Sequence, residues 1–157
     1  MIEVVSVQAV FIEHGPQRSM KDLLGEVGRD YFVSASVNET LQDEEPLPAG
    51  ETTEVRIIVG DSFSDRERTK ENIHAAAMDM NLKRPQLAHS VYLRLLGDEA
   101  LKSLGILQLY VMHEEIMDDE GYPVVIGMGC YFAPRRMGRY PTRSFPPRAG
   151  FAYLAPL

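Results

Sequence analysis

The sequence places a serine where a hydrolase could carry its nucleophile. Residues Val55–Val59 are mostly apolar and β-branched, which predicts a strand, and Gly60-Asp61-Ser62 follows directly. A serine hydroxyl at the end of such a strand is exposed to a neighbouring base, which can activate it for nucleophilic attack. The pattern therefore indicates Ser62 as a candidate nucleophile, with an acid–base partner such as His113.

The segment Val55–Asp65, VRIIVGDSFSD, resembles the nucleophile block of the GDSL (SGNH) hydrolases. The resemblance implies a serine hydrolase in which Ser62 attacks the substrate. It covers only this segment, because the chain has no Gly-x-Asn-Asp block and no aspartate three residues before a histidine near its C-terminus, where that family has its acid and base. The alternative interpretation is a strand-to-helix turn in which Ser64 caps the next helix and Glu67 completes a capping box.

His113 also belongs to a carboxylate-rich segment. His113 and Glu115 alternate along a predicted strand, so their side chains share a face and supply two ligands of the kind that zinc binds. The other ligands would have to come from distant parts of the chain, and the acidic run Asp118-Asp119-Glu120 beside them is typical of a solvated turn. We therefore expect neither a metal nor another cofactor.

The charge of the chain changes sign near its end. The formal net charge is −7, but residues 134–157 hold five of the 16 basic residues and none of the 23 acidic ones, so residues 1–133 carry −12 and the tail +5. The acidic part should repel nucleic acid and anionic membranes, whereas the tail should attract them. Five prolines in the tail oppose a helix or a central strand. We therefore predict an extended C-terminal arm over residues 134–157.

We expect this arm to be docked, because fixing each residue costs on the order of 1–2 kcal/mol and apolar anchors must offset that cost. A basic, aromatic arm favours docking on an acidic neighbour, either a second copy in a homo-oligomer or another subunit of an assembly. The residues expected to contact this partner are Arg135, Arg136, Arg139, Tyr140, Arg143, Phe145, Arg148, Phe151, Tyr153 and Leu154. Two alternatives stay open: the arm packs on its own body, or it binds single-stranded nucleic acid through arginines and stacked aromatic rings.

Periodicity along residues 1–133 predicts one α+β domain. Strands are expected at 2–12, 31–37, 54–59, 106–117 and 122–132, and helices are expected to begin at Ser19, Ser64, Pro85 and Glu99. The result is a mixed or antiparallel sheet of about five strands with two to four helices packed on it. The acidic segment 38–53 is predicted as an exposed loop or arm. Gly127 and Gly129, on one face of a strand, predict a close approach by a neighbouring segment.

Composition sets limits on location and function. No apolar run approaches the roughly 20 residues that span a bilayer, no signal peptide is visible, and the single cysteine, Cys130, cannot form an internal disulfide. We expect a cytoplasmic protein or a component of a virus-like particle, with no membrane contact. The predicted function is non-enzymatic: a structural or assembly protein, for example a viral or phage virion component, fastened into a homo- or hetero-oligomer by its arm. The alternatives are a small serine hydrolase and single-stranded nucleic-acid binding through the arm.

Overall fold

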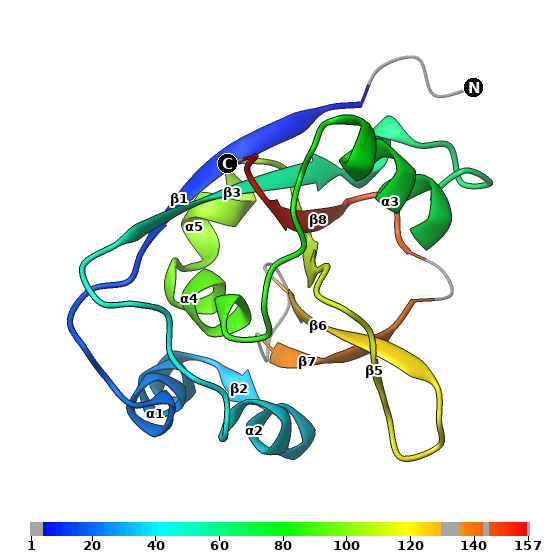
Figure 1. Ribbon diagram of the computed structural model, residues 1–157. Helices are drawn as coiled ribbons and strands as arrows, with labels where there is room; N and C mark the ends of the chain where they lie inside the picture. Colours follow the sequence, from blue (N-terminus) through cyan, green and yellow to red (C-terminus); the bar gives the residue numbers. More distant parts are fainter. Residues whose placement is uncertain (1–4, 130–135, 143–144, 157) are drawn as a thin grey trace.

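The chain folds as an α+β protein built on one mixed sheet (Figure 1). The computed structural model describes residues 5–129, 136–142 and 145–156. Over these residues the sheet has eight strands in the order β1-β3-β8-β4-β6-β7-β2, with β5 paired to β6. The strands are β1 Val7–Glu13, β2 Phe32–Val33, β3 Thr52–Val59, β4 Gln108–Val111, β5 Ile116–Met117, β6 Pro123–Gly129, β7 Arg136–Pro141 and β8 Ala149–Leu154. All neighbours are antiparallel except the β4–β8 and β2–β7 pairs.

Five α-helices occur in the described part of the chain: α1 Met20–Asp30, α2 Ala35–Leu41, α3 Lys70–Asp79, α4 His89–Leu95 and α5 Asp98–Lys102. A short 3-10 turn, η1, covers Gly60–Ser62. As predicted, Ser19 caps α1, since its hydroxyl accepts the N–H of Asp22. The predicted cap at Ser64 is wrong: its hydroxyl binds Glu67, but the chain makes a turn there and α3 begins after Thr69.

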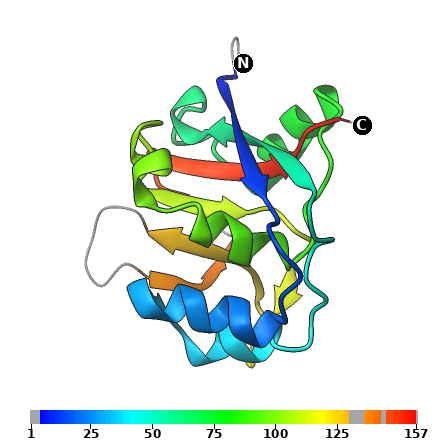
Figure 2. The ribbon, with the colours of Figure 1, turned by 90° about the vertical axis from the view of Figure 1, so that its left-hand side faces the viewer.

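The two faces of the sheet carry separate apolar cores. Helices α1, α2, α4 and α5 cover one face, together with inward residues of the central strands such as Ile57, Leu109 and Ile126. Helix α3 and the loops around it cover part of the other face, where Phe151 and Tyr110 are central. Figure 2 shows the two helices α1 and α2 below the sheet strands β6 and β7. Alternate residues of each strand therefore enter different cores.

The expected extended arm over residues 134–157 is not confirmed. Residues of β7 and β8 are strands of the sheet, and β8 lies between β3 and β4, with Phe151 and Ala152 fully buried. The number of prolines does not exclude a central strand, because their spacing leaves room for one. Pro141 ends β7, Pro146 and Pro147 precede β8, and the six residues Ala149–Leu154 contain no proline. The sheet is continuous only when the tail supplies this strand.

Other expectations about the fold need correction. The sheet has eight strands where about five were expected, and five helices are present where two to four were expected. The predicted strand 31–37 is only two residues long, because Ser34 caps α2 with a hydrogen bond to Val37. The acidic segment 38–53 begins inside that helix, and Leu41 and Leu47 are buried, so apolar residues spaced along the segment anchor it to the core.

The close approach predicted at Gly127 and Gly129 is confirmed at Gly127, whereas a Cβ atom at Gly129 would make only an ordinary contact, 3.4 Å from Gln108 Oε1. A Cβ atom at Gly127 would lie 2.9 Å from the carbonyl oxygen of Leu109 and 2.9 Å from the ring of Tyr140. The turn predicted at 118–121 is also present, closing the hairpin of β5 and β6 with the hydrogen bond from Asp118 N–H to the carbonyl of Tyr122. Within the described residues, no helix has the length and apolar character needed to cross a membrane.

Candidate functional site

His113 lies where the predicted strand 106–117 is interrupted between β4 and β5. Its ring replaces the missing ladder contact, since Nε2 accepts the backbone N–H of Ile126 at 3.0 Å and Nδ1 donates to the carbonyl oxygen of Glu114 at 2.7 Å. The residue is 2% exposed, and burial lowers the pKa of its imidazole. Both ring nitrogens of this neutral histidine are therefore engaged by backbone groups.

Ser62 and His113 lie at opposite ends of the sheet. Ser62 follows the C-terminal end of β3, and His113 follows that of β4. Because β3 is antiparallel to β8 and β8 is parallel to β4, these two strand ends point in opposite directions. Ser62 Oγ accepts the backbone N–H of Ser6 at 2.7 Å and so joins η1 to the start of β1. The structure does not bring the predicted nucleophile and base together.

Arg84 organises a polar network near the end of β8. Its guanidinium donates to His74 Nε2 at 2.8 Å and to the carbonyl oxygen of His113 at 3.1 Å, and His74 Nδ1 donates to the hydroxyl of Tyr153 at 2.5 Å. Burial, followed by the Arg84 charge, lowers the pKa of His74, and burial raises the pKa of Tyr153 above its ordinary value. The neutral histidine therefore connects α3, β8 and the loop that carries Arg84.

Glu115 belongs to a different set of contacts from His113. Its carboxylate accepts from Lys70 Nζ at 3.1 Å and from the hydroxyl of Thr142. Burial raises the pKa of Glu115, but the hydrogen bonds from Thr142 and Lys70 outweigh burial and leave the pKa below its ordinary value. Among the residues that the structure describes, no three His, Cys, Asp or Glu side chains come together as a metal site.

The aromatic residues of the tail lie in the protein's own core. Tyr140, Phe145 and Phe151 surround Tyr110, with ring centroids 5.9, 4.9 and 5.8 Å from it. Burial raises the pKa of Tyr110 to about 12. Tyr153 is 2% exposed, and its hydroxyl is hydrogen-bonded to His74. Leu154 packs against the helix-covered core. These rings are engaged within the fold and are not presented for base stacking.

The arginines of the tail differ in their surroundings. Arg139 is half-buried in a pocket with Asp118 and Glu120, and Arg148 is exposed. Arg135 and Arg143 lie outside the described residues, and Arg136 is described only as a backbone position of β7. The predicted partner-binding residues therefore do not form one docking surface over the part of the tail that the structure describes.

The outer edge of β1 is a strand edge that stays unpaired among the described residues. β1 pairs only with β3 among the described strands, and it lies above β3 at the top of the sheet in Figure 1. His14 donates to Glu51 and Val59 donates to Ser6, so residues with even numbers along β1 direct their backbone groups toward β3. The N–H and C=O groups of Val7, Ala9, Phe11 and Glu13 consequently point to the free edge.

The side chains at this edge are unusual for an unpaired strand. Phe11 is 58% exposed, and Ala9 and Glu13 beside it are exposed as well. Native edge strands are commonly protected by lysine, proline, a bulge or short length. β1 has seven residues, VQAVFIE, with no lysine, arginine or proline. The edge therefore retains the features that favour pairing with another strand.

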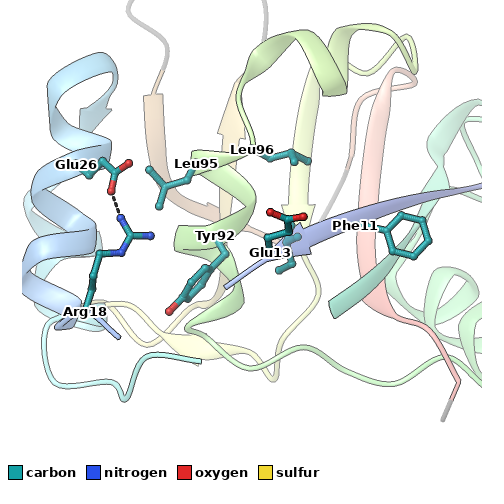
Figure 3. A pocket seen from close by; sticks show the side chains of 8 residues that line it. Phe11, Glu13, Arg18, Glu26, Tyr92, Leu95 and Leu96 are labelled. Atoms are coloured by element: carbon teal, nitrogen blue, oxygen red, sulfur yellow. Dashed lines mark hydrogen bonds and ion pairs between the residues drawn. The ribbon is translucent and has the colours of Figure 1, made fainter. Parts of the chain in front are cut away.

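A half-open pocket of about 370 Å³ adjoins β1 on its helix-covered side (Figure 3). Glu13 and Ile12 lie at its β1 wall, Leu95 of α4 lies opposite, and Arg18 and Glu26 form an ion pair at the α1 side. Arg18 Nε is buried and has no hydrogen-bond partner within the described part of the chain. The pocket therefore places an open space, lined in part by polar side chains, next to the free edge of β1.

The sequence predicted the strand at 2–12, but it did not identify the edge. Whether a strand is central or at an edge depends on strand order, which periodicity does not encode. The absence of proline and basic residues from β1 was the available signal, and it has meaning only for an edge strand.

No protein-family model, curated protein or solved structure matches the chain.

Proposed function

We propose that the protein is a non-enzymatic structural or assembly subunit that forms a homo-oligomer by adding a strand to the outer edge of β1. The observation that carries this proposal is the row of outward backbone groups at Val7, Ala9, Phe11 and Glu13 beside the exposed ring of Phe11. Strand addition satisfies these groups with main-chain hydrogen bonds, and apolar side chains contribute the remaining stabilisation. The single cysteine of the chain is compatible with a reducing compartment such as the cytoplasm for this assembly.

The geometry gives an enzymatic function less support than an assembly function. The hydroxyl of the candidate nucleophile Ser62 accepts a hydrogen bond from the backbone N–H of Ser6. Both ring nitrogens of the candidate base His113 form hydrogen bonds with backbone groups. A general base must reach the proton that it removes, either directly or through one water. Ser62 and His113 follow strand ends at opposite ends of the sheet, so His113 is too far away to act as the base for Ser62.

Ala9→Pro tests the proposal because the Ala9 N–H points away from β3. Proline removes this outward donor without removing a β1–β3 hydrogen bond, as edge strands tolerate. The matched control is Ala9→Ser, which keeps the N–H and a small side chain. Light scattering should give a multiple of 17.6 kDa for the full chain and for Ala9→Ser, and 17.6 kDa for Ala9→Pro.

Circular dichroism would show whether Ala9→Pro stays folded. If it does not, Phe11→Lys provides a second test, because a charge at the exposed edge opposes pairing and leaves the backbone intact. A full chain that is monomeric over a range of concentrations, or an oligomer that survives both substitutions, would overturn the proposal.

A further inference from the structure

We infer that the strand added to β1 is β1 of a second copy, antiparallel and related by a two-fold axis, with Val10 opposite Val10. This inference rests on the proposed function and specifies the partner and the register. It predicts a closed dimer whose two sheets continue into each other across the axis.

The choice of β1 as its own partner follows from the other edges of the sheet. At the opposite end, β2 has two residues, and the short strand β5 also has two. β7 is paired to β2 over its first two residues, and Ser34 donates to the carbonyl of Met137 there. Among the described residues, no other free edge matches the seven residues of β1. A head-to-tail contact would need such an edge, whereas a two-fold contact uses the same edge twice.

The register follows from which backbone groups point outward. Within β1, Val7, Ala9, Phe11 and Glu13 present their N–H and C=O groups to the free edge, so pairing of two copies through β1 joins these four to the same four of the second copy. All four are used when Val7 lies opposite Glu13 and Ala9 lies opposite Phe11. This arrangement yields about eight hydrogen bonds between the two copies, since each opposed pair exchanges two. A shift of two residues in either direction leaves three such pairs and about six hydrogen bonds.

The side chains are complementary in this register. The large ring of Phe11, 58% exposed, lies opposite the small Ala9 of the second copy, and the reverse holds at the symmetric position. The two Phe11 rings are then diagonal neighbours on one face, a spacing of about 7–8 Å that aromatic side chains can bridge. Glu13 lies opposite Val7, so no carboxylate faces another carboxylate across the axis.

The pocket beside β1 agrees with the same register. Ile12 lies in its wall, and the register places Gln8 of the second copy opposite Ile12. Gln8 and Ile12 project to the same side of the sheet, because their numbers are both even. The amide oxygen of that Gln8 can accept a hydrogen bond, and Arg18 Nε in the pocket is buried without a partner in the described residues. The pocket is therefore where the second copy's Gln8 side chain is accommodated.

A disulfide across the axis tests the register. Val10 directs its backbone groups to β3, so Val10 and its symmetry mate form a non-hydrogen-bonded pair with Cα atoms about 4.5 Å apart. A disulfide accepts Cα separations of about 4.4–6.8 Å. In a Cys130→Ser background, Val10→Cys should give a covalent dimer on non-reducing gels after mild oxidation.

Gln8→Cys in the same background is the matched control, because it lies on the same face of β1. Its symmetry mate is four residues away along the strand, about 13 Å, which is too far for a disulfide. Cross-linking of Gln8→Cys as fast as Val10→Cys would overturn the inferred register. If Ala9→Pro abolishes the oligomer but Val10→Cys does not cross-link, the proposed function stands and this inference fails. A monomeric full chain removes both.

Discussion

Replacing Asp98 by asparagine tests how much of the fold's stability depends on one buried ion pair. Arg94 of α4 and Asp98 of α5 form an i,i+4 ion pair whose side chains are 0% and 3% exposed. The guanidinium also donates to the carbonyl of Gly129 at 3.1 Å and lies 3.9 Å from the ring centroid of Tyr31. The pair thus connects two helices, β6 and the end of α1.

The expected magnitude follows from what Asp98→Asn leaves behind. The Arg94 charge remains buried without its counter-charge, and breaking a buried pair in this way typically costs about 3–5 kcal/mol. Small proteins have a total free energy of unfolding of about 5–15 kcal/mol. For a chain of this length, about 3–5 kcal/mol corresponds to a fall in Tm of roughly 6–20 °C.

Urea unfolding of four proteins completes the test as a double-mutant cycle: the parent, Asp98→Asn, Arg94→Met and the double variant. Each single variant should lose about 3–5 kcal/mol, because each removes one partner of a buried ion pair and leaves the other charge buried. The double variant buries no charge at this position and should lose much less than the sum. Additive losses, or single losses under about 1 kcal/mol, would refute the reasoning, since they indicate a solvated pair.

Two further results are expected. Gly150→Ala should destabilise the fold by about 1–3 kcal/mol, because its Cβ would meet two buried isoleucine side chains at 2.7 and 2.9 Å. Its control, Gly25→Ala, is exposed in α1 with open space around it and should stabilise the fold by about 0.5–1 kcal/mol. Equal effects of the two substitutions on urea unfolding would argue against β8 as a packed central strand. Burial lowers the pKa values of His74, His89 and His113 below 6.5, so the unfolded chain binds more protons as the pH falls. The free energy of unfolding should therefore be greatest above pH 6.5 and should fall as the pH decreases through the folded pKa values, and a flat profile between pH 7.5 and 5 would contradict this.

The sequence predicted the start of a helix correctly where only one capping residue was available. Ser19 caps α1 because its hydroxyl accepts the N–H of Asp22, three residues ahead, and no rival cap lies nearby. Ser64 and Thr69 do compete: Ser64 satisfies the sequence pattern and binds Glu67, yet the hydroxyl of Thr69 accepts the N–H of Asn72 and starts α3. A capping pattern therefore located this helix start only to within five residues, because two hydroxyl residues lie close together.

The candidate sites were harder to predict because their chemistry depends on pairing. The shared face of His113 and Glu115 follows from an unbroken strand, but the chain leaves the ladder there and the imidazole takes the place of a backbone acceptor for Ile126. Glu115 is then held by Lys70, 45 residues away in sequence. The spacing of His113 and Glu115 in the sequence does not predict these contacts, so residue type alone indicated a candidate site that the structure does not assemble.

The C-terminal strand β8 covers the edge of β3 that β1 does not occupy, and β1 is left as the edge strand at this end of the sheet. β1 pairs with one side of β3, and β8 occupies the other side and joins β3 to β4. Strands that follow each other in sequence usually become neighbours, but here the C-terminal strand separates β3 from β4. Without β8, β3 would also present a free edge, and that edge carries Ile57 and Ile58, which are both fully buried in the folded protein. Under the proposed strand addition, the tail therefore acts by covering β3 and leaving β1 exposed, and not by reaching a partner itself.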